Sequence, residues 1–147
     1  MKKVPQVMSA MTPFPYSIDV DELVTKAREM MAAHDIRHLP VKDRGELVGV
    51  ITDRDIKLTL GPSLGIPSGH KLKVRDVAVF EAYVVDIGER LDSVLLHMAR
   101  HHVGSALVVK DGRLAGIFTT SDACKSYGEH LRGHFPVSSG DGGGDAA

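Results

Sequence analysis

The sequence GVITDRD at residues 49–55 recurs as GIFTTSD at residues 116–122. Both copies share the pattern Gly-apolar-apolar-Thr-x-x-Asp. An apolar run of this kind favours a buried strand, and the Thr and Asp that follow it are typical of the first turn of a helix. Each copy therefore predicts a strand that leads directly into a helix.

The similarity extends well beyond these two stretches. A shift of 67 residues aligns residues 7–55 with residues 74–122 without a gap and gives 13 identical pairs. Long internal similarity at a fixed offset indicates a duplicated structural unit. We therefore divide the chain into a first repeat with its Gly/Pro-rich linker (1–65), a second repeat (66–133) and a flexible Gly/Ser/Asp-rich tail (134–147).

Hydrophobic spacing predicts the same elements in both repeats. The predicted elements are helices at 19–34 and 86–102, first strands at 38–41 and 105–109, second strands at 47–51 and 114–118, second helices after Thr52 and Thr119, and short leading strands near 16–18 and 83–85. About 60 residues bury too little apolar surface to be stable alone, so the two repeats should share a core. The predicted fold class is α/β (α+β), with two tandem β-α-β-β-α repeats packed with pseudo-two-fold symmetry.

Composition restricts the classes of partner. The chain of 147 residues has 18 basic and 19 acidic side chains, so the formal net charge of −1 argues against nucleic-acid binding. A single Cys excludes an internal disulfide and a Cys-based zinc cluster. Since no apolar run fits a signal peptide or a membrane span, we expect a cytoplasmic protein without a membrane partner.

The repeated Thr and Asp side chains could bind a nucleotide. A helix start offers free N–H groups that suit phosphate, to which Thr52 and Thr119 would add hydroxyl donors. Asp55 and Asp122 could accept hydrogen bonds from the two hydroxyls of a ribose, as acidic residues do in dinucleotide folds. The alternative is that each Thr-x-x-Asp is only a capping box for its helix. Duplication does not decide between the two, because caps are duplicated too.

The repeated segments resemble the signature of the CBS domain, named after cystathionine β-synthase. In the first repeat the resemblance rests on IRHLPV (36–41) followed by GVITDRD, and in the second on LVV (107–109) followed by GIFTTSD. The leading segments VMSAMT (7–12) and VRDV (74–77) also match. The resemblance covers about residues 5–130 and is closest to a stand-alone bacterial CBS pair, like the paired CBS part of acetoin-utilisation-type proteins.

This resemblance implies a Bateman module, in which two CBS repeats bind adenosine-containing ligands (AMP, ADP, ATP, S-adenosylmethionine or NAD) in the clefts between them. It also implies a homodimer that regulates an unidentified partner protein. No nucleophile elbow, Walker loop or dinucleotide fingerprint is present, so we expect no enzymatic activity and no required cofactor. The alternative function is a ligand-free structural module for dimerisation and protein interaction.

The resemblance also assigns roles to individual residues. Ribose or phosphate contacts fall on Thr52 and Thr119, ribose hydroxyl contacts on Asp55 and Asp122, adenine contacts on Thr12, Pro13, Val79 and Phe80, and phosphate contacts on Arg37 and His38.

The two repeats differ at the phosphate positions. Gly104 and Ser105 stand where the first repeat has Arg37 and His38. A cation binds phosphate more strongly than a neutral donor, because charge-assisted hydrogen bonds are roughly twice as strong. We therefore predict one dominant nucleotide site on the Arg37/His38 side and a weaker or empty second site.

Two histidine pairs have the i,i+4 spacing of helical zinc ligands: His97 with His101, and His130 with His134. Neither pair has an obvious acidic or Cys partner within the same turn. The sequence therefore favours ordinary helix-face histidines and predicts no metal site.

Overall fold

The computed structural model describes residues 3–60 and 71–137. The predicted linker at 61–69 and most of the predicted tail lie outside these residues. The elements, in chain order, are η1 (Val7–Ser9), β1 (Thr12–Pro13), β2 (Ile18–Asp19), α1 (Val24–His34), β3 (His38–Asp43), β4 (Glu46–Thr52), α2 (Asp53–Leu60), η4 (Val74–Asp76), β5 (Val84–Asp86), α3 (Leu91–His101), β6 (Ser105–Lys110), β7 (Arg113–Thr119) and α4 (Thr120–His134).

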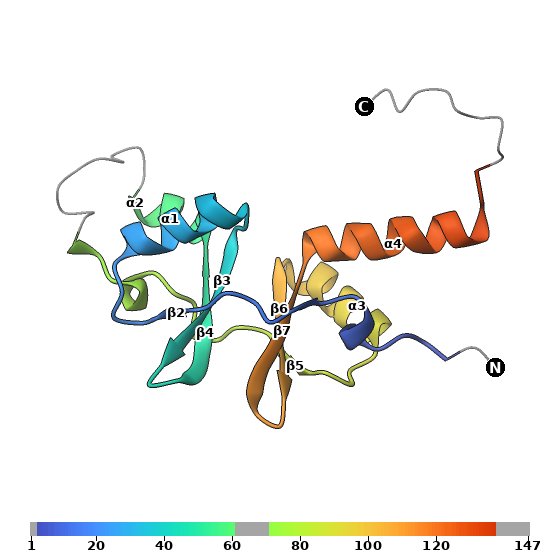
Figure 1. Cartoon of the computed structure of the whole chain (residues 1–147), viewed down its shortest axis with the longest axis horizontal. Helices are drawn as coiled ribbons and strands as arrows, with labels where there is room; N and C mark the ends of the chain where they lie inside the picture. The colour runs from blue at the N-terminus through green and yellow to red at the C-terminus, as the bar shows by residue number, and fades with distance from the viewer. Residues whose placement is uncertain (1–2, 61–70, 138–147) are drawn as a thin grey trace.

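Each repeat folds as a leading strand, a helix, a two-stranded hairpin and a second helix, which confirms the predicted fold class and element order. The first repeat forms a three-stranded sheet in the order β2-β3-β4, and the second forms β6, β7 and β5 with β1 added at the edge. In each sheet the leading strand pairs in parallel and the hairpin pairs antiparallel. The two sheets lie side by side, with α1 and α2 on one unit and α3 and α4 on the other (Figure 1).

Each hairpin turns through two residues with positive φ. Arg44 and Gly45 have φ of 52° and 81°, and their equivalents Asp111 and Gly112 have φ of 51° and 76°. Two successive positive φ values match the right-handed twist of the flanking strands, and the second position is a glycine because it adopts this conformation without strain. A tight two-residue turn therefore joins the two hairpin strands of each repeat.

The predicted start of each first helix is wrong by five residues. Helix α1 begins at Val24, rather than at residue 19, and α3 begins at Leu91, rather than at residue 86. Val20 contributed to the helical spacing, but its backbone N–H donates to the Lys42 carbonyl at 3.0 Å, so it extends the strand pairing instead. A buried Val satisfies both patterns, and hydrogen bonding to the neighbouring strand decides between them.

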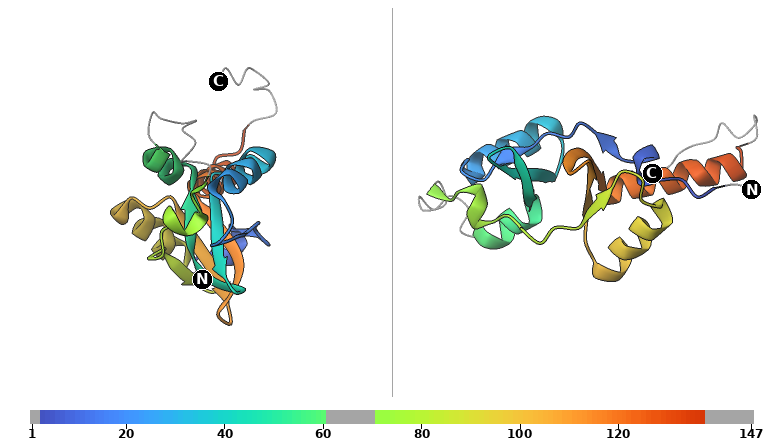
Figure 2. Two further views of the ribbon diagram at one scale, coloured as in Figure 1. Left: turned by 90° about the vertical axis from the view of Figure 1, so that its left-hand side faces the viewer. Right: turned by 90° about the horizontal axis from the view of Figure 1, so that it is seen from below.

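The leading segment of each repeat crosses to the other repeat. Residue Val7 donates its N–H to the Glu89 carbonyl, and Val74 donates to the Glu22 carbonyl, both at 2.8 Å. The 67-residue offset relates these two bonds, so they express the pseudo-two-fold symmetry directly. The blue N-terminal trace and the yellow-green segment before β5 can be followed across the molecule in opposite directions (Figures 1 and 2).

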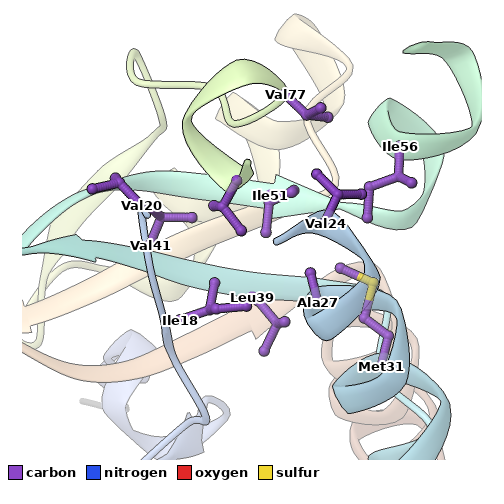
Figure 3. Close-up of a cluster of buried hydrophobic side chains, with 11 residues drawn as sticks. Ile18, Val20, Val24, Ala27, Met31, Leu39, Val41, Ile51, Ile56 and Val77 are labelled. Carbon is purple, nitrogen blue, oxygen red and sulfur yellow. The ribbon is translucent and has the colours of Figure 1, made fainter. Parts of the chain in front are cut away.

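This crossing places each leading segment in the other repeat's hydrophobic core. Val74 and Val77 belong to the cluster built on the first sheet, where Val77 lies near Ile56 and Val24 (Figure 3). Val7 is fully buried in the cluster built on the second sheet. A third, smaller cluster of Val50, Leu107 and Ile117 joins the two sheets. The repeats therefore cannot separate without exposing core residues.

A glycine on the last strand of each repeat admits the crossing backbone. A Cβ at Gly49 would overlap the Val79 carbonyl, and one at Gly116 would overlap the Met11 sulfur and lie 3.0 Å from the Thr12 carbonyl oxygen. The crossing segments pair with these strands, through the Val50–Val79 bridge and through β1 against β7. The two glycines thus allow the chain's own leading segments to approach the strand backbones closely.

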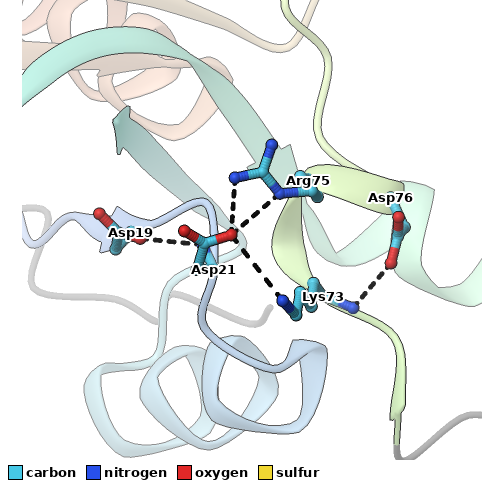
Figure 4. A network of polar contacts seen from close by, with 5 residues as sticks. All are labelled: Asp19, Asp21, Lys73, Arg75 and Asp76. Carbon is cyan, nitrogen blue, oxygen red and sulfur yellow. Dashed lines mark hydrogen bonds and ion pairs between the residues drawn. The ribbon is translucent and has the colours of Figure 1, made fainter. Parts of the chain in front are cut away.

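Only one crossing has an ion pair among the described residues. The Arg75 guanidinium donates to Asp21 Oδ1 from Nη2 at 2.6 Å and from Nε at 3.0 Å, and the Lys73 ammonium lies 4.0 Å from the same oxygen (Figure 4). The Arg75 hydrogen bond and charge lower the pKa of Asp21 below its ordinary value. The equivalent positions in the other crossing hold Met8 and Gly88, so the symmetry of the backbone is not repeated in the charges.

Helix α4 differs from the other helices in its exposure. Its 15 residues include none that is buried, and it extends away from the sheets (Figures 1 and 2). Tyr127 and Leu131 are exposed by 64% and 38% and lie four residues apart, so they share one face of the helix, and Phe135, exposed by 73%, directly follows its last turn. Across the two described ranges, no helix combines the length and the apolar character that a bilayer crossing requires.

Candidate functional site: a cleft between the repeats

A cleft of about 900 Å³ opens between the two repeats. Its walls come from β3, β4 and α2 of the first repeat, from the segment before β5, and from α3, β6 and the start of α4. The lining residues are Arg37, His38, Val50, Thr52, Asp53, Arg54, Asp55, Leu58, Val79, Glu81, Ala82, Tyr83, Met98, Ala99, His102, Val103, Gly104, Ser105 and Thr120. This volume lies within the range of small-molecule sites.

The repeated Thr and Asp of the first repeat meet in this cleft. Thr52 Oγ1 donates to Asp55 Oδ2 at 2.8 Å and accepts from the Asp55 N–H at 3.0 Å. The Thr therefore caps α2, and the hydroxyl is also bonded to the carboxylate. An ionised carboxylate has about four acceptor positions. Within residues 3–60 and 71–137, Asp55 Oδ1 accepts no side-chain hydrogen bond, which leaves this oxygen able to accept ligand hydroxyls.

Arg37 and His38 stand at the start of β3 on the same cleft. The Arg37 carbonyl accepts from the Asp53 N–H at 2.9 Å and so joins β3 to the first turn of α2. Residue His38 is paired with Thr52 across the hairpin. Burial is the main cause that lowers the pKa of His38 below its ordinary value, opposed by the Asp55 carboxylate and assisted by the Arg37 guanidinium.

The cleft carries charge of both signs. The Asp53 carboxylate forms an i,i+4 ion pair with Lys57 at 2.8 Å, whereas Arg54 has no ion-pair partner among the residues described. Glu81 lines the opposite wall, and burial raises the pKa of the neighbouring Tyr83 above its ordinary value. A cation on α2 together with Arg37 suits an anionic group, and Asp55 suits a group that donates hydrogen bonds.

The second repeat places its Thr and Asp in a different setting. Asp122 lines a separate groove of about 840 Å³, together with Thr12 and Pro13. Its carboxylate accepts from Thr12 Oγ1 at 3.1 Å, from Thr119 Oγ1 at 3.1 Å and from the Thr119 N–H at 2.9 Å. Thr119 and Asp122 form a reciprocal capping box on α4, so this copy, like the first, caps its helix.

The structure thus sorts the predicted ligand residues into two groups. One group lines the cleft between the repeats and consists of Arg37, His38, Thr52, Asp55 and Val79. The other lines the separate groove beside α4, here called the Asp122 groove, and consists of Thr12, Pro13 and Asp122. The remaining two, Phe80 and Thr119, line neither of these spaces. The ligand contacts of all ten residues stay predictions.

The sequence did not single out the second-repeat wall of the cleft. Tyr83, directly before β5, and His102, directly after α3, line it. The repeat alignment compares equivalent positions, but it does not indicate which non-equivalent positions face each other across the axis. The glycine in the GVITDRD motif was the available signal, because it marks the strand against which the segment leading to Tyr83 packs.

Of the two histidine pairs, His101, His130 and His134 are exposed, whereas His97 is half-buried. The rings of His97 and His101 are 4.2 Å apart, and Tyr83 stacks on His97 at 3.8 Å. The rings of His130 and His134 are 4.4 Å apart. In the part of the chain that the structure describes, no three His, Cys, Asp or Glu residues gather into a group that could hold a metal ion.

A family model for the CBS domain matches this chain twice, at residues 6–61 and 74–129. The chain belongs to the CBS domain family. The first match lies within the first repeat and the second within the second repeat.

Known proteins resemble this CBS pair along most of its length. Hypoxic response protein 1 of Mycobacterium tuberculosis is 33% identical over 110 residues, which are 74% of this chain and 76% of that protein; a crystal structure of Hypoxic Response Protein I contains two coordinated zinc ions. A putative acetoin utilization protein (AcuB) from Vibrio cholerae superposes with a TM-score of 0.77 at 24% identity, covering 90% and 98% of the two chains. The CBS domain pair of protein MJ0100, solved with 5′-methylthioadenosine and S-adenosyl-L-methionine, has a TM-score of 0.77 at 25% identity over 87% and 99%.

Proposed function

We propose that this CBS pair is a regulatory module that binds one adenosine-containing ligand in the cleft between its repeats. The observation that carries the proposal is the Asp55 carboxylate, which has an unengaged oxygen in a cleft of about 900 Å³ beside Arg37 and His38. A relative at 25% identity, the MJ0100 pair, was solved with two adenosine derivatives, which supports this class of ligand.

Each part of such a ligand has a suitable partner in the cleft. Asp55 and Thr52 would hold the ribose hydroxyls, in keeping with the acceptor positions still open on the carboxylate. Val50 and Val79, joined by their backbone bridge, offer apolar surface for adenine. Arg37 and Arg54, the two guanidinium groups that line the cleft, would receive phosphate. AMP, ADP, ATP, S-adenosylmethionine and NAD all share the adenosine portion.

We assign a weaker or empty site to the second repeat. Asp122 already accepts three hydrogen bonds, one of which comes from Thr12 of the crossing segment. A ribose would have to displace the Thr12 hydroxyl, and the positions equivalent to Arg37 and His38 hold the uncharged Gly104 and Ser105. The proposed stoichiometry is therefore one ligand per chain.

The proposed mechanism is regulatory and not catalytic. Because the cleft is lined by both repeats, a bound ligand would favour one relative arrangement of the repeats, which a partner protein would then recognise. No cofactor is required for this action. A cytoplasmic location, where adenine nucleotides are available, is part of the proposal.

Thermal unfolding with and without millimolar AMP, ADP, ATP, S-adenosylmethionine and NAD tests the proposal, since a ligand that binds only the folded state raises Tm. At least one of these ligands should raise Tm and bind with a stoichiometry of one. Asp55→Asn should weaken binding about tenfold or more, because hydrogen bonds to a charged group contribute about 1.5–3 kcal/mol. The matched variant Asp122→Asn should retain the affinity. If no ligand raises Tm, the ligand-free structural module is the correct function.

We further propose that the module is a homodimer that uses helix α4. Its fully unburied length and the aligned Tyr127, Leu131 and Phe135 form an apolar stripe that a second copy can cover. Light scattering should give a dimer mass for the native chain and a monomer mass for the double variant Tyr127→Ser/Leu131→Ser. The control Arg132→Ser, on the same helix, should remain dimeric. A monomeric native chain would refute this assembly.

A further inference from the structure

His38 lies directly at the contact between the two repeats. Its Nε2 atom is 3.0 Å from the position that a Cβ on Gly104 would occupy. Ser105 is the residue equivalent to His38 in the second repeat. Two imidazole rings would compete for this space across the pseudo-two-fold axis, whereas the small pair Gly104–Ser105 admits one. The ring that remains lines the proposed ligand cleft together with Asp55.

The surroundings of this ring contain several groups that affect its charge. Asp55 favours the protonated ring, whereas burial and Arg37 favour the neutral one, and burial is the largest influence, so the pKa of His38 lies below its ordinary value of 6.5. The other titratable or charged groups that line the cleft are Asp53 and Arg54 on α2, Glu81 and Tyr83 before β5, and His102 after α3. Asp53 is paired with Lys57. His38 is therefore neutral near pH 7 when the cleft is empty.

We propose that an anionic adenosine ligand makes His38 take up a proton on binding, so that the cleft selects phosphorylated ligands over neutral ones more strongly as the pH falls. This inference rests on the proposed ligand cleft. A phosphate beside Arg37 and His38 introduces negative charge next to a half-buried ring. An opposite charge within about 4–6 Å favours the imidazolium form of the ring. The ligand and the proton then stabilise each other's binding. A neutral ligand supplies no such charge.

The direction of the pH dependence follows from these charges. The pKa of His38 is higher in the complex with an anion than in the empty cleft. Affinity for the anion therefore rises as the pH falls through the higher pKa and levels off below the lower one. One titrating group changes the affinity by at most about tenfold per pH unit.

Isothermal titration calorimetry with AMP and with adenosine, at pH values from about 7.5 to 6.0, tests this inference. The ratio of AMP affinity to adenosine affinity should rise about threefold or more as the pH falls by one unit. Titrations in two buffers of different ionisation enthalpy should show proton uptake with AMP and none with adenosine. The phosphate of AMP also takes up a proton in this pH range. The pH dependence of AMP binding to the native chain is therefore compared with that of a variant that lacks the imidazole.

His38→Gln keeps a polar side chain of similar length but has no titrating ring. If this variant does not fold, His38→Asn is used in its place. Both should bind adenosine as the native chain does and lose the rise in the AMP-to-adenosine ratio. His101→Gln, an exposed histidine at the end of α3 that does not line the cleft, is the matched control and should keep that rise. If adenosine and AMP bind to the native chain with the same pH dependence, the inference is wrong but the proposed function is intact. Failure of both to bind would overturn both.

Discussion

The Asp55 cleft and the Asp122 groove arise from the same seven-residue motif, yet they present their carboxylates differently. Asp55 bonds to its own Thr52 and keeps one oxygen free, whereas Asp122 is bonded to Thr119 and also to Thr12 from the crossing segment. The residue that stands at the position of Thr12 in the other crossing is Val79, which has no hydroxyl. One side chain supplied by the other repeat therefore distinguishes the two sites.

This comparison teaches that duplicated motifs diverge through what packs against them. Both Thr-x-x-Asp copies cap a helix, so capping alone explains why the pattern is present. What can further bind to each Asp depends on the crossing segment and on the residues at the repeat contact. His38 facing Gly104 is the second example, because a ring on one side of the axis requires a small residue on the other.

The largest expected effect comes from filling the two motif glycines. Gly49→Ala should lower the free energy of unfolding by about 3 kcal/mol, because its Cβ meets the backbone carbonyl of Val79, which cannot move without breaking the crossing. Gly116→Ala should cost about 1–2 kcal/mol, because the flexible Met11 side chain can yield. Urea unfolding measures both. Equal losses would show that the two crossings are equally rigid.

An intermediate effect is expected from exchanging the residues at positions 12 and 79. Thr12→Val removes the hydrogen bond to Asp122, so in the Asp55→Asn background it should improve AMP binding at the second site about tenfold. The reciprocal change Val79→Thr should weaken binding in the Asp55 cleft. Calorimetry measures both affinities, with the Asp55→Asn single variant as reference. If Thr12→Val adds no binding, the missing cation at Gly104 and Ser105 is what weakens the second site.

The smallest expected effect concerns the ion pair found in one crossing. Arg75→Met places there the residue type found at Met8, and it should lower Tm only slightly at pH 7, since exposed ion pairs contribute little. Arg75 lowers the pKa of Asp21, so its contribution is present above the ordinary pKa of 3.8 and disappears as the pH falls through the lowered value. The Tm difference between the native chain and Arg75→Met should therefore vanish in acid. In the Asp21→Asn background, Arg75→Met should cause no pH-dependent change in Tm. A difference that persists below that range would indicate a packing role for Arg75.

Much of the fold could be predicted because each signal was local. The hairpins follow from apolar runs separated by a turn with glycine, and the starts of α2 and α4 follow from Thr52 and Thr119. The starts of α1 and α3 were wrong because Val20 and Ile87 fit a helical spacing, but their N–H groups bond to Lys42 and Val109 of neighbouring strands. Those partners lie 22 residues further along the chain, beyond the range of a periodicity argument.

The site could be predicted only in part. Thr52 and Asp55 are three residues apart, so their meeting at a helix start follows from local geometry. The Thr12–Asp122 bond joins residues 110 positions apart, and no pattern near either residue indicates it. The repeat alignment showed that Gly104 and Ser105 stand at the positions of Arg37 and His38. The steric reason is a contact between the repeats, because the His38 ring lies against Gly104.

The sequence by itself determined that the chain is a duplicated β-α-β-β-α unit, since periodicity, turn residues and repeated motifs are properties of neighbouring residues. The tertiary structure alone decided that each leading segment completes the other repeat's core. It also decided that the Thr12 hydroxyl donates to the Asp122 carboxylate and that the His38 ring lies against Gly104. These contacts depend on which surfaces bury most apolar area when two similar units pack around a pseudo-two-fold axis. A residue's own neighbours along the chain do not specify that choice.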